Sequence, residues 1–300
     1  MKGVLDKLKH TYDKKYKALL VIPILLMFLS IASILFQYFT TGDFIHRGVT
    51  LKGGVTITIP SITGASSSDI ETLLKENFPG QDIAVRILKA QGEEKGFVID
   101  AELQTEEEIS NLKSLLYQEY GLGEEDLGIE IMGSALGASF FKETFKSIII
   151  AFLFMSIVVF IYYKLPIPSL TVILCAFADI ISTLAVVNIL GIKLSTAGIA
   201  AFLMLIGYSV DTDMLLTTRV LIRKEGTLQE KILGAMKTGM MMTTTTIAAV
   251  IAALIFARSD VLIQIMTIIL IGMVFDIIYT WLQNVALLRM YVERKEKKHG

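Results

Sequence analysis

The chain has 300 residues, of which 53% are hydrophobic and 19% charged, with a formal net charge of −1 and a mean hydropathy of +0.63. Soluble domains carry about a quarter charged residues, so this composition argues against a wholly soluble protein. The net charge says nothing about partners, and the sequence offers no obvious binding site for nucleic acid. Its one cysteine, Cys175, excludes an intrachain disulfide and a thiolate metal site.

Apolar runs of about 20 residues, the length that crosses a bilayer as a helix, recur along the chain. The first follows a Lys-rich tail, residues 1–17, but is too long for a signal-peptide core and lacks a small-residue cleavage site, so we expect a retained anchor. The six predicted spans are residues 18–39, 145–163, 167–190, 195–217, 240–257 and 262–288. A second polar tail covers residues 289–300.

Residues 42–140, between the first and second spans, are expected to form a separate domain. We predict strands over Val49–Ile59, with a bend at Gly53–Gly54, and over 82–90, 96–103 and 126–132. Helices are predicted over 66–77 and 105–120, each opening on a capping residue. The order β-α-β-β-α-β predicts a ferredoxin-like module. The expected fold class is therefore a membrane α-helical bundle of six transmembrane helices with an inserted α+β ferredoxin-like domain.

Orientation follows from the distribution of Lys and Arg. The two tails and the loops on their side hold seventeen of these residues, whereas the two short opposite loops hold only Lys193 and Arg258. Because cytoplasmic loops are enriched in positive charge, both termini are expected in the cytoplasm. Residues 42–144 are then expected outside the cell membrane.

Motifs of enzymes and cofactor sites are absent from the sequence. We find no HExxH, GxSxG or GxxxxGK[ST] pattern, and the three histidines, His10, His46 and His299, are far apart. The sequence therefore predicts no metal, no cofactor and no enzymatic activity.

Four acidic residues fall inside the predicted spans: Asp179, Asp211, Asp213 and Asp276. A charge at this depth costs roughly 3 kcal/mol on insertion scales, and intramembrane acids are functional by default. No Lys, Arg or His lies deep enough in a predicted span to neutralise them. An acid in this environment is expected to hold a proton, and to act as a relay if water reaches it.

Asp211 is the first candidate for such a relay, because it lies in a polar stretch, residues 207–213, of the fourth span. Asp211 and Asp213 point about 200° apart on a helix, so they cannot face the same neighbour. Tyr208 shares the Asp211 face. Asp179 and Asp213 are further relay candidates, and for Asp213 and Asp276 structural hydrogen bonding is an equal alternative.

Several polar residues are candidates to support these acids. Arg219 lies near the cytoplasmic end of the fourth span, in a basic stretch, residues 219–237, that we expect to form a cytoplasmic surface helix. Lys237 is better interpreted as a membrane-interface anchor. Thr244 and Thr245 could line a wet path opposite Asp211, or could only pack between helices.

Several motifs of the sequence resemble those of SecF, within the SecD–SecF family of the RND superfamily. Residues 47–54 resemble the G-x-D-F-x-G-G element after the first span, with Thr50 in place of Asp. Residues 177–179 resemble L-x-H-D, residues 207–209 match G-Y-S, and Lys237 with Thr244-Thr245 resembles R-T-(x)n-T-T. Residues 210–216 are closer to the V-D-A-N-V-L-I of SecD, which suggests the archaeal branch.

The resemblance implies a non-enzymatic role in protein export driven by the proton-motive force. It implies a SecD-like subunit, the Sec translocation channel, a translocating polypeptide and membrane lipid as partners. It assigns the acid of the fourth span to Asp211 and the basic partner to Lys237. Two alternatives stay open: an RND-type exporter of small molecules or lipids, and an assembly factor of the translocase without ion coupling.

Overall fold

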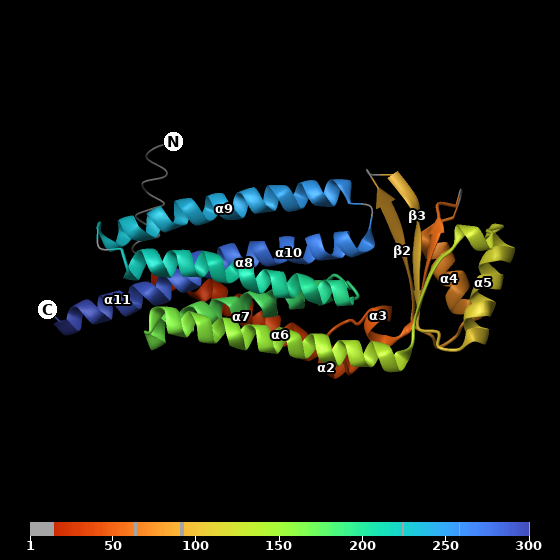
Figure 1. Ribbon diagram of the computed structural model, residues 1–300, viewed down its shortest axis with the longest axis horizontal. Coiled ribbons are helices and arrows are strands. Elements are labelled where there is room, and N and C mark those ends of the chain that lie inside the picture. The colour runs from red at the N-terminus through yellow and green to blue at the C-terminus, as the bar shows by residue number, and fades with distance from the viewer. Residues whose placement is uncertain (1–14, 63–64, 91–92, 224, 258, 300) are drawn as a thin grey trace.

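The computed structural model describes residues 15–62, 65–90, 93–223, 225–257 and 259–299. A long helical bundle carries a small α/β domain at one end (Figure 1). The first 14 residues of the predicted N-terminal tail, Arg258, and residues 91–92 between two of the predicted strands lie outside the described residues.

Six helices are long and apolar enough to cross a membrane, which confirms the predicted number of spans. These candidate spans are Lys15–Thr41, Ser134–Tyr163, Pro166–Ile189, Thr196–Leu221, Leu228–Phe256 and Val261–Lys297. The corresponding elements are α2 (Val21–Thr41), α6 (Ser134–Tyr163), α7 (Pro166–Ile189), α8 (Thr196–Leu221), α9 (Leu228–Phe256) and α10 (Asp260–Ile278). The last span continues from α10 through a π-helix, η2 (Tyr279–Asn284), into α11 (Val285–His299).

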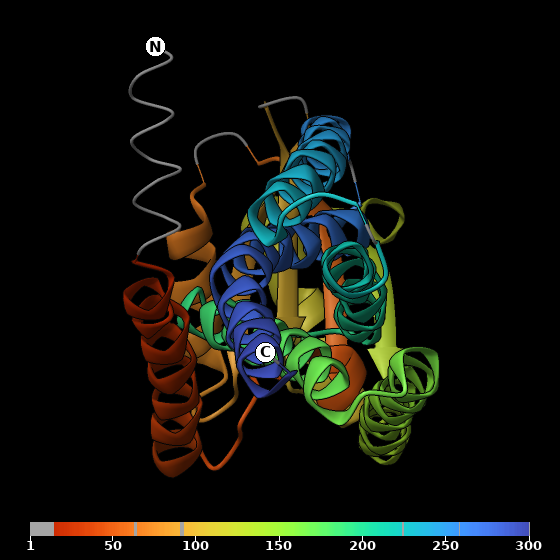
Figure 2. The same cartoon turned by 90° about the vertical axis from the view of Figure 1, so that its left-hand side faces the viewer.

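α7 and α8 form the centre of the bundle. In each of them 56% of the most apolar 18-residue stretch is buried inside the protein, against 28% or less in the other four spans. Figure 2, looking along the bundle, shows α2 and α6 on opposite sides of it. The central helices are therefore the ones on which buried polar groups can meet.

Two helices begin earlier than their apolar runs. α9 starts at Leu228, where Thr227 and Glu230 form a capping box, so the predicted surface helix over 219–237 is wrong. Arg219 belongs to the last turn of α8 and Lys237 to α9. α6 begins at Ser134, eleven residues before the predicted span, because a polar helical segment precedes the apolar one.

The α/β domain contains four strands and two long helices. Its elements are β1 (Gly54–Pro60), α4 (Ser67–Asn77), β2 (Ile83–Ala90), β3 (Glu93–Ala101), α5 (Glu106–Tyr120), a short 3₁₀ turn η1 (Glu124–Asp126) and β4 (Gly128–Met132). The strands lie in the order β2-β3-β1-β4, and all neighbours are antiparallel.

The two faces of the sheet have different neighbours. Val55, Ile57 and Ile59 of β1 are buried with the apolar residues of α4 and α5, and Figure 1 shows these helices on the side away from the bundle. The alternate residues Thr56 and Thr58 line a cleft toward the bundle. The alternation of the strands therefore separates a closed apolar face from an open polar one.

Capping boxes start both helices of the domain. The Thr105 hydroxyl accepts from the Glu108 backbone N–H at 3.2 Å, and the Glu108 carboxylate accepts from the Thr105 N–H at 3.1 Å. Ser66 and Asp69 form the same reciprocal pair at α4. The hydrogen bonds from these capping hydroxyls lower the pKa of both Glu108 and Asp69.

The prediction of one strand over Val49–Ile59 is wrong in its first half. Val49–Lys52 form a helical turn, α3, and β1 begins only at Gly54. Gly53 and Gly54 have φ angles of 95° and 130°, which interrupt both structures. At this break the chain passes from the bundle into the domain.

Candidate functional site

Three carboxyl groups from three helices are buried together in the centre of the bundle. Asp179 of α7, Asp213 of α8 and Asp276 of α10 are 0%, 0% and 4% exposed. We call these residues the three-carboxyl site. Asp213 faces inward on α8, whereas Asp211, about 200° away around the helix, is exposed on the outer face.

Hydroxyl and amide groups hold these carboxyls. Thr280 Oγ1 lies 2.9 Å from Asp213 Oδ1 and 3.2 Å from Asp276 Oδ1, so one hydroxyl serves two acids. Asn284 Nδ2 donates to Asp213 Oδ1 at 2.7 Å. Ser209 donates to Asp179 from the neighbouring helix. The site thus joins α7, α8, α10 and η2.

The π-helix η2 supplies Thr280 and Asn284. A π-turn widens a helix by one residue and occurs often at functional sites. Both residues escaped the sequence analysis, although each is a polar residue in an apolar run and Thr280 lies one turn after Asp276. A search for polar residues at helical spacing from the acids would have found them.

Part of the hydrogen-bonding capacity of the site is unused. Asp179 Oδ1, Asp213 Oδ2 and Asn284 Oδ1 are buried and have no hydrogen-bond partner among the described residues. A buried polar atom in this state is costly and normally meets water or a proton. The two carboxylate oxygens are therefore places where a proton or a water could bind.

A small cavity links this site to the outer face of α8. Its volume is about 50 Å³, room for one or two waters. Asp211 and Asp276 both line it, as does Tyr208. Asp211 therefore stands at the rim of a pocket whose inner wall includes one of the buried carboxyls.

The supporting residues predicted from sequence lie in different places. Tyr208, Thr244 and Thr245 are exposed on the outer faces of α8 and α9, and the Thr245 hydroxyl donates to carbonyls of its own helix at 2.8 and 3.0 Å. Arg219 donates to Gly234 O at 2.6 Å and to Thr238 Oγ1 at 2.9 Å, both on α9. Lys237 is exposed on α9. Arg219 thus joins two helices at one end of the bundle.

Metal ligation finds no support in the described part of the chain, where no group of three or more His, Cys, Asp and Glu residues could hold an ion. Cys175 is fully buried beside η2, where Gln283 Nε2 donates to its sulfur at 3.5 Å. This is the structural role that a lone cysteine in an apolar run indicates.

Fold and site together define a polytopic membrane protein with an inserted α/β domain. Residues 114–294 match the family described as "Protein export membrane protein SecD/SecF, C-terminal". The chain belongs to the SecD/SecF family of protein-export membrane proteins, as its motifs suggested. As a member of this family it is not an enzyme.

Archaeal SecF proteins are similar over almost the whole chain. The SecF of Pyrococcus furiosus is 34% identical over 293 residues, with 98% of this chain and 97% of the relative covered. That of Methanocaldococcus jannaschii is 38% identical over 299 residues, with 95% and 99% covered.

The fold is also that of a larger solved protein. The crystal structure of SecDF from Thermus thermophilus, described as a translocon-associated membrane protein, superposes with a TM-score of 0.77 at 18% identity. The match covers 93% of this chain but only 38% of that one.

Proposed function

We propose that the chain is a SecF-like accessory subunit of protein export through the Sec pathway. The similarity to SecF proteins along the whole chain supports this role. Because the chain spans 38% of the SecDF chain, we expect a separate SecD-like subunit to supply the rest. The translocation channel and the emerging polypeptide are the further partners that this role requires.

The proposed site of ion coupling is the three-carboxyl site, with Asp211 at its outer rim. The observation that carries this proposal is the burial of Asp179, Asp213 and Asp276 on three helices. One oxygen of Asp179 and one of Asp213 have no partner within the part of the chain that the structure describes. A proton bound there changes the charge on which the packing of these helices depends. Moving one charge through 100 mV is worth about 2.3 kcal/mol, enough to shift a two-state population roughly fifty-fold.

We further propose that the α/β domain lies outside the membrane, that both termini are cytoplasmic, and that the domain is of the ferredoxin-like type. The excess of Lys and Arg on the side of the termini supports the orientation. The strand order β2-β3-β1-β4 and the element order support the domain type. In this orientation the domain meets an exported chain as it emerges.

Replacement of the acids by asparagine, which keeps the size of each side chain, tests the coupling. Asp179→Asn, Asp213→Asn and Asp276→Asn are expected to lower the export rate of a secreted reporter at least tenfold at full proton-motive force. Asp211→Asn is expected to lower it less, because Asp211 is exposed. Glu119→Gln on the exposed surface of α5 is the control.

Copurification with the SecD-like subunit is measured on the same variants. Export at the control rate in all three buried variants would contradict ion coupling and favour the assembly factor. Loss of export together with loss of the partner would show that the acids act in assembly.

A further inference from the structure

The chain crosses between the bundle and the α/β domain at a single place. It enters through Gly53–Gly54 and leaves through Gly133, and Gly54 pairs with Met132 across β1 and β4. A Cβ on Gly53 would lie 2.4 Å from Ser134 Cα, so the two crossings are in contact. Two adjacent crossings at glycines form a pivot for the domain.

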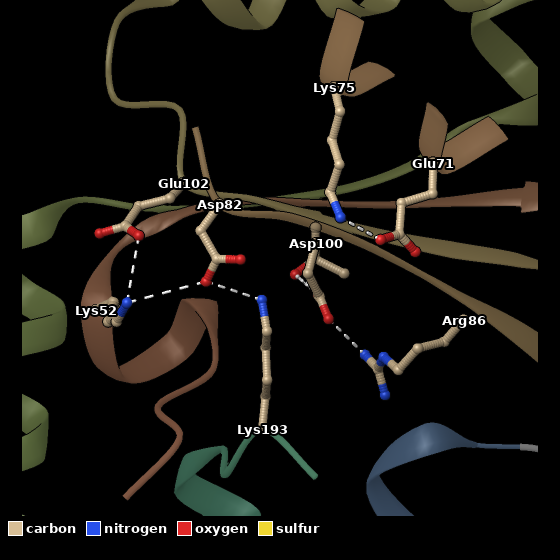
Figure 3. Close-up of polar contacts among 9 residues, drawn as sticks. Lys52, Glu71, Lys75, Asp82, Arg86, Asp100, Glu102 and Lys193 are labelled. Atoms are coloured by element: carbon tan, nitrogen blue, oxygen red, sulfur yellow. Dashed lines mark hydrogen bonds and ion pairs between the residues drawn. The ribbon is translucent and has the colours of Figure 1, made fainter. Parts of the chain in front are cut away.

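A second attachment lies at the edge of the sheet opposite β4. Asp82 directly precedes β2, the strand at the edge opposite β4. Its carboxylate accepts from Lys193 Nζ at 3.0 Å, and Lys193 belongs to the turn between α7 and α8 (Figure 3). Lys52 adds an ion pair to Asp82 at 3.9 Å and one to Glu102 at 3.3 Å. The Lys193–Asp82 pair therefore ties the far edge of the sheet to the bundle.

Pivot and ion pair line one narrow pocket, and further along the strands the domain is not closely packed on the bundle. A cleft of about 280 Å³ separates the open face of the sheet, at Thr56 and Arg86, from Ser195 and Gln264 of the bundle. Lys193 and Asp82 are 24% and 47% exposed, so their ion pair is weak and screened by salt. This attachment can open without disturbing an apolar core.

The turn that carries Lys193 also joins the helices of the three-carboxyl site. It connects α7 to α8 directly, and Gln264 Nε2 of α10 donates to Lys193 O at 2.6 Å. On its other side Leu194 exchanges backbone hydrogen bonds at 2.7 Å with His46 and Gly48, in the segment that leads to the pivot. A rearrangement of α7, α8 and α10 thus reaches Lys193 through covalent and hydrogen-bonded contacts.

We propose that Lys193 and Asp82 form a releasable latch, which fixes the α/β domain against the turn between α7 and α8, and that the domain swings about the Gly53–Gly133 pivot when the latch opens. The latch rests on the geometry alone. Its use in moving an exported polypeptide rests on the proposed function.

Spin-label distance measurements on the full chain in lipid nanodiscs test the latch. Labels at Asn111→Cys on α5 and Phe256→Cys on α9 lie on exposed positions of the domain and the bundle, and the native Cys175 is buried. We expect Lys193→Gln to widen the distance distribution at least twofold and Asp82→Asn to widen it further, because Asp82→Asn also removes the Lys52 contact. The double variant should equal Asp82→Asn.

Lys75→Gln is the matched control, because Lys75 pairs with Glu71 within α4 (Figure 3). It should leave the distribution unchanged, and Lys193→Arg should retain the narrow one. The labelled chain without further substitutions should widen reversibly in about 1 M salt, where the Debye length is about 3 Å. A distribution that stays narrow in Asp82→Asn, and at high salt, would overturn the latch. The measurement involves no export, so its outcome is independent of the outcome for ion coupling.

Discussion

Thr280 connects two of the three buried carboxyls through one hydroxyl. Thr280→Val keeps the shape of the side chain and removes that donor. Leaving a buried acceptor unpaired costs about 1–3 kcal/mol, so we expect the free energy of unfolding to fall by this amount. Denaturant unfolding in detergent measures it.

Thr245→Val provides the comparison at the same substitution. The Thr245 hydroxyl is exposed and bonds only its own helix backbone in the described contacts, so we expect a change within about 0.5 kcal/mol. Equal losses in both variants would show that the threonines act through helix propensity and not through the acids.

Glu108 makes the start of α5 sensitive to acid. Its capping bonds to Thr105 lower the pKa of its carboxyl in the folded chain below the unfolded value of about 4.3. The stabilisation is therefore present above pH 4.3 and is lost as the pH falls through the lowered folded pKa. Hydrogen exchange of the α5 amides should accelerate in that range.

Thr105→Ala removes the capping hydroxyl that lowers the pKa of Glu108. We expect this variant to exchange faster near neutral pH and to lose most of the additional acceleration in acid. Unchanged exchange in both pH ranges would mean that the capping box does not limit the opening of α5.

The acids of the site could be named from the sequence, but their relative importance could not. Charge inside an apolar run marks Asp179, Asp211, Asp213 and Asp276 as exceptional. Which of two acids 200° apart faces the core depends on the neighbouring helices, and the structure buries Asp213 and exposes Asp211. Thr280 is detectable by its helical spacing from Asp276, but its contact with Asp213 depends on how the last span packs against α8.

At the scale of elements, the break between α3 and β1 depends on glycine. Gly53→Ala puts a Cβ at φ 95° and 2.4 Å from Ser134 Cα. Left-handed strain costs about 1–2 kcal/mol, and displacement of packed neighbours costs about 1–3 kcal/mol. We therefore expect a loss of about 2–5 kcal/mol in the free energy of unfolding.

Gly80→Ala separates these two causes. Gly80 has a φ of 87° but nothing within 4 Å of an added Cβ, so only the strain of about 1–2 kcal/mol should appear. If both variants lose the same amount, Ser134 moves aside for the added Cβ at no cost, which would contradict tight packing of the two chain crossings.

The starts of helices could be predicted where a capping pair marks them in the sequence. Ser66 and Thr105 begin α4 and α5 as expected. The same kind of box at Thr227 begins α9, yet the search for apolar length placed that span twelve residues later, at residue 240. The length of an apolar run locates the part of a helix that lipid can surround, whereas the capping residue locates the point where the helix begins.

At the scale of the whole molecule, the orientation can be tested directly. Asn111→Cys on α5 should react with a membrane-impermeant thiol reagent in intact cells, because we place the α/β domain outside. Glu296→Cys in α11 should react only after permeabilisation. The reverse pattern would contradict the orientation derived from Lys and Arg.

The plan of six spans and one inserted domain could be predicted because apolar length and charge segregation are long, additive signals. The way the domain sits on the bundle could not. It depends on single polar contacts between distant residues, such as Lys193 with Asp82, 111 positions apart. No periodic pattern in a single sequence indicates that two such distant residues are in contact.

Because Gly54 and Met132 are paired neighbours, the α/β domain is an insertion that begins and ends at the same place. Antiparallel partners lie about 5 Å apart, so a few glycines could close the gap left by excising everything between them. The membrane helices would keep their connections, and a foreign domain with adjacent ends could be spliced into the same place. The sequence of the domain can thereby change while the connections of the membrane helices stay the same.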